Sequence, residues 1–177
     1  MRAWLIALWW LCGSLHAAPA APAYVGQELG AARLSGQGNY TWFGLKIYAA
    51  ELWLGPQGYA ADGVPLVLEL RYARALNGAR IADASVEQMA HIGAGSPAQR
   101  SAWLAQMKAI FPDVQDGTRL AGVLLPGQGV RFYRDGQLLA TVADPAFARA
   151  FFGIWLDPAT SAPKLREALL RDAAARP

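Results

Sequence analysis

The stretch from Asp144 to Leu170 reads DPAFARAFFGIWLDPATSAPKLREALL and predicts two amphipathic helices with a tight connection between them. Its opening Asp-Pro pair is typical of a helix N-terminus, because aspartate caps the first turn and proline fits the first helical position. Large apolar residues then recur at i, i+4, i+7 and i+8, namely Phe147, Phe151, Ile154 and Trp155. A second Asp-Pro pair ends this helix, and the last short helix is expected from Pro163 to Arg171.

Three strands are expected before these helices. Their apolar residues lie at 119–125, 130–134 and 137–142, with turn residues between them. Asp135-Gly136 separates the last two strands and is a strong signal for a two-residue hairpin, because such a turn needs positive φ at both positions.

Further towards the N-terminus the pattern predicts two longer strands. Residues 42–54 are apolar on both faces apart from Lys46 and Glu51, which is typical of a central strand covered on both sides. Residues 65–72 alternate, so that one face of this strand is expected to be wetter. Residues 24–34 are interpreted as a leader and candidate edge strand, and residues 36–38 as a turn.

Two further helices are expected between these groups of strands. Asn77 can cap one that runs to about residue 92, and Ser96-Pro97 opens the next. The apolar stripe of the first contains Ser85 and Gln88, which leaves two interpretations open: a thinly packed helix edge, or a helix that lines a cleft. The whole order predicts an α+β fold, with a large antiparallel sheet and a layer of helices on one face.

The first residues have the character of an export signal. Arg2 precedes an apolar run at 3–15 that is too short to span a bilayer, and small residues follow it. We expect a signal peptide at 1–17 with cleavage near Ala17 or Ala18, a leader at 18–33 and one domain at 34–175. The mature protein would be periplasmic or secreted, with no membrane span; an uncleaved membrane anchor is the alternative. Cys12, the single cysteine, lies in the signal, so no disulfide is expected after cleavage.

The composition argues against several classes of function. The chain has 16 basic and 13 acidic residues, and removal of Arg2 leaves a net charge of about +2 without a basic stripe, so nucleic acid is not an expected partner. One histidine, His91, remains after the signal, and neither a metal site nor a cofactor is predicted. Several carboxylates are expected to be solvated or to cap helices: Glu51, Glu69, Asp83 and Glu87.

The order and spacing of several segments resemble the bacterial chalcone isomerase-like family. These segments are FGLKIYAAELWL at 43–54, LVLELRY at 66–72, LNG at 76–78, LPGQG at 125–129, FYRDG at 132–136 and the two C-terminal helices. The resemblance implies a large antiparallel sheet backed by helices, with a cleft between the two. It also implies one of two activities, because plant members close a phenolic ring in that cleft, whereas related plastid members bind fatty acids there without catalysis.

Matched to the family pattern, this chain lacks the catalytic side chains. The family's arginine falls on or near Tyr40 and its strand threonine near Tyr48. The Tyr, Lys and Asn of the family's helix fall near Ile81, Ala84 and Gln88. Since charge stabilisation and orientation are most of what such a site supplies, we expect no catalytic residue for ring closure.

Three functions remain open. The first is binding of a small apolar or acyl ligand such as a fatty acid, with its polar end near Tyr40, Lys46, Tyr48, Arg80 and Gln88. The second is an intramolecular lyase or isomerase in which Tyr48 or Lys46 acts as acid or charge stabiliser. The third is an interaction protein whose own side chains fill the cleft. An open apolar cleft would favour the first function, and a collapsed cleft the third.

Overall fold

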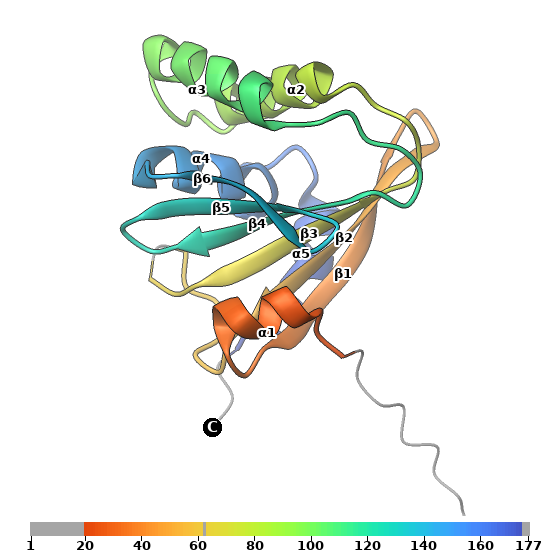
Figure 1. Ribbon diagram of the computed structural model, residues 1–177, viewed down its shortest axis with the longest axis vertical. Helices are drawn as coiled ribbons and strands as arrows, with labels where there is room; N and C mark the ends of the chain where they lie inside the picture. The colour runs from red at the N-terminus through yellow and green to blue at the C-terminus, as the bar shows by residue number, and fades with distance from the viewer. Residues whose placement is uncertain (1–19, 62, 175–177) are drawn as a thin grey trace, which may run out of the picture.

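A computed structural model describes residues 20–61 and 63–174 of the chain. Its centre is one antiparallel sheet in which each strand pairs with its neighbours along the chain, in the order β1-β2-β3-β4-β5-β6 (Figure 1). The strands are β1 (Arg33–Trp42), β2 (Leu45–Leu54), β3 (Leu66–Tyr72), β4 (Arg119–Leu125), β5 (Gly129–Arg134) and β6 (Gln137–Val142).

Helices cover the two faces of the sheet unequally. They are α1 (Ala23–Leu29), α2 (Gly78–His91), α3 (Pro97–Ile110), α4 (Pro145–Leu156) and α5 (Pro163–Leu169). α4 packs on β4 and β5, and α5 packs on β1 and β2, whereas α2 packs on α3 and α4 (Figure 1). The short helix α1 lies on the opposite face (Figure 1). The expected α+β class, with a sheet and a layer of helices on one face, is therefore confirmed.

Local sequence signals set most helix starts as predicted. The Asn77 side chain accepts a hydrogen bond from the Ala79 N–H at 3.0 Å. Ser96 begins α3 with a capping box, and Asp144 begins α4 by accepting the N–H groups of the first helical turn. Asp135 and Gly136 both have positive φ, as the predicted β5–β6 hairpin requires.

The N-terminal part of the sheet corrects three predictions. Residues 23–29 form α1, so the leader is not an edge strand there. Residues 36–38 lie inside β1 and are not a turn. The strand expected at 42–54 begins only at Leu45, because Phe43 and Gly44 both have positive φ and form a tight turn between β1 and β2. The predicted signal peptide lies outside the described residues.

The glycines of β1 have a packing role that a local pattern does not reveal. A Cβ atom on Gly36 would lie 2.0 Å from the Ala168 carbonyl oxygen, and one on Gly38 would lie 2.7 Å from the Leu165 side chain. These glycines therefore allow α5 to lie directly against β1.

The covering by α1 also changes the expected exposure of β3. Leu66, Leu68, Leu70 and Tyr72 face the large core under α4, as the alternation predicts. Val67 and Glu69 on the other face are buried as well, and in β3 only Arg71 is exposed, so the wetter face is largely dry. The reason is that Tyr24 and Val25 of α1 pack over this face together with Trp53.

Candidate functional site: a cleft between sheet and helices

An open cleft of about 590 Å³ lies between the sheet and the helices on the α4 side. Strands β1 to β5 and helices α2 and α4 all contribute to its walls. Most of the lining is apolar, including Ile47, Leu68, Leu70, Leu76, Ile81, Phe111, Leu120, Phe132, Phe151 and Ile154. Of the two interpretations of α2, the structure thus supports the helix that lines a cleft.

The packing of α2 explains why this space stays open. α2 rests on α3 and α4, and the residues that it directs to the cleft are mixed in character. Ala82 and Met89 are buried in the core, whereas Arg80 and Ala84 are exposed although they line the cleft. Ile81 is the one large apolar residue that α2 contributes to the lining, and the other residues it contributes are small, polar or charged, so this face of α2 does not fill the space.

Four of the five residues predicted for ligand binding come together around this cleft: Tyr40, Tyr48, Arg80 and Gln88. Lys46 is exposed and does not belong to the lining. A bulge accounts for the difference, because Tyr40 pairs with Tyr48 while Thr41 pairs with Lys46, which leaves Ile47 as an extra residue in β2. Ile47 therefore enters the lining, and Lys46 is directed elsewhere.

Three tyrosines supply polar groups to the wall of the cleft that the sheet forms. The rings of Tyr40 and Tyr48 are stacked with centroids 5.1 Å apart, and Tyr72 meets Tyr48 edge to face at 5.9 Å. The Trp155 indole N–H donates to the Tyr48 hydroxyl at 2.9 Å. Within the described residues, the Tyr72 hydroxyl has no hydrogen-bond partner.

Burial raises the pKa values of Tyr48 and Tyr72 above that of an ordinary tyrosine. Both hydroxyls therefore keep their protons at neutral pH and can donate hydrogen bonds into the cleft. The same burial makes either of them a poor source of a phenolate base.

The helix side of the cleft carries the charged groups. Asp83 forms an ion pair with Lys108 of α3 at 2.8 Å, and Gln88 accepts a hydrogen bond from the Ser161 hydroxyl. Arg80 has no ion pair among the residues that the structure describes. It is thus a cation at the cleft that remains available to an acidic group.

Sequence reasoning missed Tyr72 and Trp155 as polar contributors. The alternation of β3 already places Tyr72 on the same face as three leucines, which was a usable signal. Trp155 belongs to the predicted apolar stripe of α4, and its ring is buried. Its hydrogen bond to Tyr48 depends on the packing of α4 over β2, which a local pattern does not contain.

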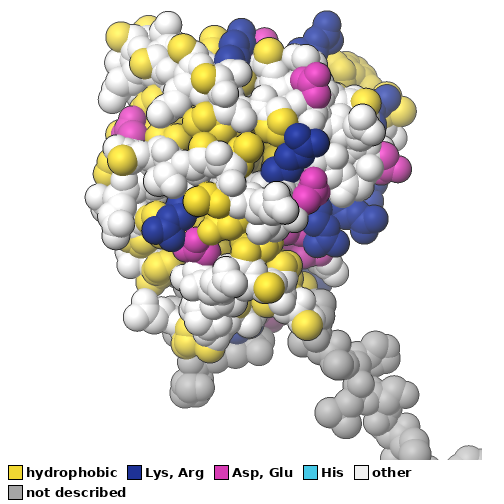
Figure 2. All heavy atoms as spheres, viewed as in Figure 1, with side chains coloured by type: hydrophobic (Ala, Val, Ile, Leu, Met, Phe, Trp, Pro, Cys, Tyr) yellow, Lys and Arg dark blue, Asp and Glu magenta, His cyan; other side chains and the backbone are white. Residues whose placement is uncertain are grey.

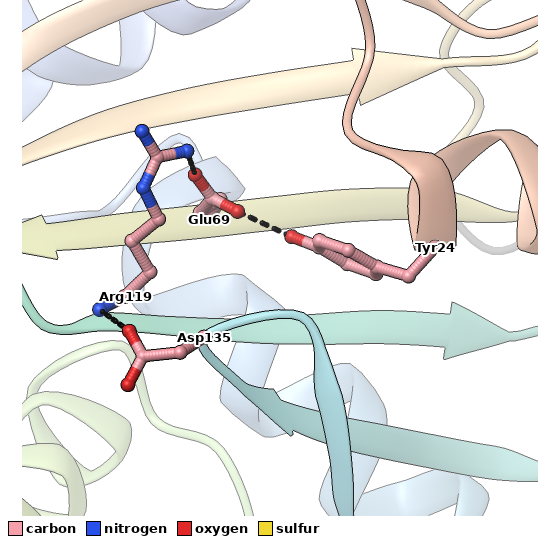
Figure 3. Close-up of polar contacts among 4 residues, drawn as sticks. All are labelled: Tyr24, Glu69, Arg119 and Asp135. Atoms are coloured by element: carbon pink, nitrogen blue, oxygen red, sulfur yellow. Dashed lines mark hydrogen bonds and ion pairs between the residues drawn. The ribbon is translucent and has the colours of Figure 1, made fainter.

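The opposite face of the sheet holds a separate polar network (Figure 3). Glu69 is buried, accepts a hydrogen bond from the Tyr24 hydroxyl, and forms an ion pair with Arg119 at 2.8 Å. The Arg119 backbone N–H in turn donates to Asp135 at 2.9 Å. The expectation that Glu69 is solvated or caps a helix was therefore wrong, because α1 covers it and supplies its partner.

This network fastens α1 to the sheet. A second set of contacts does the same, because Glu28 of α1 pairs with Arg131 at 2.8 Å and accepts a hydrogen bond from Tyr133. The carboxylates of Glu69 and Glu28 thus both have partners, and both lie on the sheet face away from the cleft. They are consistent with a structural role.

Two general properties bear on function. Among residues 20–61 and 63–174, no helix is long and apolar enough to cross a bilayer. Within the same residues, no three His, Cys, Asp or Glu side chains gather as a metal site would require. On the face shown in Figure 2, basic side chains stand near acidic ones, and hydrophobic side chains reach the surface in patches between them.

Comparison with known proteins defines the class. Residues 21–171 match the chalcone isomerase-like family model, and the chain belongs to this family. An uncharacterized protein of Haemophilus influenzae is 30% identical over 135 residues, which cover 76% of this chain and 66% of that protein, just under two thirds of its length.

A solved structure supports the same fold. The crystal structure of a fatty-acid binding protein of Arabidopsis thaliana matches with a TM-score of 0.67 at 15% identity, over 86% of this chain and 92% of that one. At this identity the likeness establishes the chalcone isomerase-like fold. The predicted family and fold are therefore confirmed.

Proposed function

We propose that this protein binds a small ligand with an apolar body and an acidic end, such as a fatty acid or another acyl compound, without catalysing a reaction on it. The observation that carries the proposal is the open apolar cleft of about 590 Å³. Its volume falls within the range of small-molecule sites, and its few polar groups are the kind that fix a ligand's orientation. The Arabidopsis thaliana neighbour in structure is a fatty-acid binding protein, which lends further support.

The polar groups suggest how such a ligand would lie. The apolar body would contact the leucines of β3 and the aromatic side chains of α4. Its acidic end would meet Arg80 together with the Tyr48 and Tyr72 hydroxyls. These hydroxyls are protonated and can donate hydrogen bonds to a carboxylate. Gln88 already accepts a hydrogen bond from Ser161 and would act as a secondary contact.

Binding is favoured over isomerisation by the state of the candidate acids and bases. Lys46 lies outside the lining, and the raised pKa of Tyr48 makes its phenol a weaker acid than an ordinary tyrosine. An interaction protein with a filled cleft is also less favoured, because the space between α2 and the sheet is open.

Export is part of the proposal. It rests on Arg2, on the apolar run that follows it and on the alanines after that run. Cell fractionation and N-terminal sequencing of the purified protein test it: a periplasmic or secreted protein that begins near Ala18 supports export, whereas a cytoplasmic protein that retains Met1 contradicts it.

The first experiment is native mass spectrometry of the purified protein, followed by solvent extraction and titration with cis-parinaric acid. A co-purifying acyl compound and saturable fluorescence enhancement are expected. The methyl ester of the same probe should bind more weakly, because it lacks the charge that Arg80 would meet.

A matched pair of variants shows whether the cleft is the binding site. Ala84→Trp places a large ring in the lining and should weaken probe binding by about tenfold or more, an effect of roughly 1.4 kcal/mol. Ala109→Trp makes the same change at an exposed position of α3 outside the lining and should bind like the wild type. Equal affinity of wild type and Ala84→Trp would contradict the proposed site.

A further inference from the structure

The tip of the β1–β2 hairpin exposes a group of large apolar side chains. Trp42, Phe43 and Leu45 are 60%, 86% and 52% exposed. The hairpin extends past the neighbouring strands, beside the loop that leads into α2 (Figure 1). Such a group lowers solubility if it has no partner, since more than half of each side chain is open to water. We call residues 42–45 the hairpin tip.

The backbone of the tip is unfavourable for the residue that occupies it. Phe43 has a φ of +46° and Gly44 a φ of +74°, the positive pair of a two-residue hairpin turn. The β5–β6 hairpin has the same arrangement, with φ values of +49° at Asp135 and +81° at Gly136. Aspartate or asparagine suits this position, whereas a bulky aromatic residue is strained there. Neither the conformation of the turn nor burial therefore explains why a phenylalanine occupies position 43.

The two aromatic rings of the tip contact each other. Trp42 and Phe43 meet edge to face with centroids 4.7 Å apart. Trp42 also belongs to the lining of the cleft. The exposed apolar surface of the tip is thus continuous with the apolar wall of the cleft.

Basic residues flank the tip. Lys46 follows it directly and is exposed. The Ala73 N–H donates to the Ile47 carbonyl at 2.9 Å, which extends the β2–β3 pairing and places Arg74 beside the Lys46 end of β2. Residues 33–50 and 70–82 contain no acidic side chain. Asp113, near the start of α2, is already held by Asn77 and by the Gly78 N–H.

We propose that the hairpin tip docks on a lipid bilayer that carries anionic headgroups. Phe43, Leu45 and Trp42 would enter the interfacial region, while Lys46 and Arg74 would contact the headgroups. Aromatic and aliphatic side chains flanked by cations are the combination that binds such interfaces. Docking in this orientation places the cleft mouth near Trp42 at the membrane, where an acyl chain could pass between the two. The inference goes beyond the proposed ligand binding, and its test does not depend on that binding.

Vesicle flotation of the purified protein tests the docking. The protein is produced from its full coding sequence, and its intact mass establishes the N-terminus that all variants must share. Wild type should float with vesicles of equal parts phosphatidylcholine and phosphatidylglycerol and bind less to phosphatidylcholine alone. The double variant Phe43→Ser/Leu45→Ser should bind the anionic vesicles about tenfold more weakly or worse.

The chain offers a matched control in β6. Leu138 and Leu139 are 58% and 36% exposed but lie away from the tip, at the other edge of the sheet. Leu138→Ser/Leu139→Ser should float like the wild type, whereas Lys46→Glu/Arg74→Glu should lose the preference for anionic vesicles. Circular dichroism verifies that each variant is folded.

Three results would overturn the proposal: no flotation of the wild type, equal flotation of the tip variant, or an equal loss in the β6 variant. Because Phe43 and Leu45 are not in the cleft lining, cis-parinaric acid should bind the tip variant as it binds the wild type. Failure of docking is therefore distinguishable from failure of the proposed ligand binding.

Discussion

The two faces of the sheet are built from alternating residues of the same strands, yet they are completed in different ways. On the α1 face, a seven-residue helix lies directly on the strands, and buried Glu69 and partly buried Glu28 hold it there through hydrogen bonds and ion pairs. On the other face, α2 packs on other helices and leaves a cleft of about 590 Å³. Glu69 and Glu28 on the first face have hydrogen-bond and ion-pair partners, whereas Tyr72 and Arg80 on the second have none among the described residues. The difference separates the face that stabilises the fold from the face available to a ligand.

The largest effect is expected from breaking the α1 face at Glu69. Glu69→Ala removes the acceptor of the buried Tyr24 hydroxyl and the partner of Arg119, and should lower the free energy of unfolding by about 2–3 kcal/mol. Urea denaturation measures this change. Asp83→Ala, which breaks an ion pair of half-exposed side chains on the cleft side, should cost only about 0.5 kcal/mol or less. Similar costs for the two variants would contradict the contrast between the faces.

A smaller effect on stability is expected within the cleft, where Tyr48 and Arg80 should differ. Tyr48→Phe deprives the Trp155 N–H of its acceptor and should lower the free energy of unfolding by about 1 kcal/mol. Arg80→Ala should change it by less than about 0.5 kcal/mol, because Arg80 is exposed. Both variants should weaken cis-parinaric acid binding. Unchanged affinity in both would remove these residues from the proposed site, whatever their stability.

The smallest effect on stability is expected from Tyr133, and it appears only at high pH. The Tyr133 ring stacks on that of Tyr24 with centroids 4.8 Å apart. Burial and its hydrogen bond to Glu28 raise the pKa of Tyr133 to about 12. The unfolded chain loses this proton near pH 10 while the folded protein still holds it, so this contribution is complete below pH 10 and is lost as the pH rises towards 12. The free energy of unfolding should therefore decline in this interval.

Tyr133→Phe is the variant that tests this assignment. It should make the decline between pH 10 and 12 shallower, measured by urea titrations at a series of pH values. Some decline should persist, because burial also raises the pKa values of Tyr24, Tyr48 and Tyr72. An identical slope in variant and wild type would show that Tyr133 does not titrate as the structure indicates.

Much of the fold could be predicted from local patterns, and the exceptions have identifiable causes. The caps at Asn77, Ser96 and Asp144 act within one helical turn, so the local sequence was sufficient. The two hairpins show the limit of prediction from local sequence. Asp135-Gly136 is a known turn signal and predicted its hairpin, whereas Phe43-Gly44 forms the same turn with a phenylalanine, which does not favour positive φ. For that reason the expected strand at 42–54 ran through a real boundary.

The candidate site was predictable in part. The family resemblance placed Tyr40, Tyr48 and Gln88 at the cleft, and the structure brings them there together with Arg80. The prediction that Lys46 lines the cleft was wrong because a one-residue bulge reverses which side chains of β2 face the cleft. The local sequence pattern does not indicate this extra residue. That these side chains contact a ligand stays a prediction.

The sequence by itself determined the elements that depend on near neighbours: the helix starts, the apolar stripe of α4, the alternation of β3 and the β5–β6 turn. The tertiary structure alone decided which polar groups are buried and which space is left empty. Glu69 is buried because α1 folds back across the sheet, and Gly36 is needed because α5 arrives from more than 120 residues later in the chain. The cleft exists because α2 packs on helices and does not descend to the strands. These outcomes depend on contacts between distant segments, whose geometry no short stretch of sequence contains.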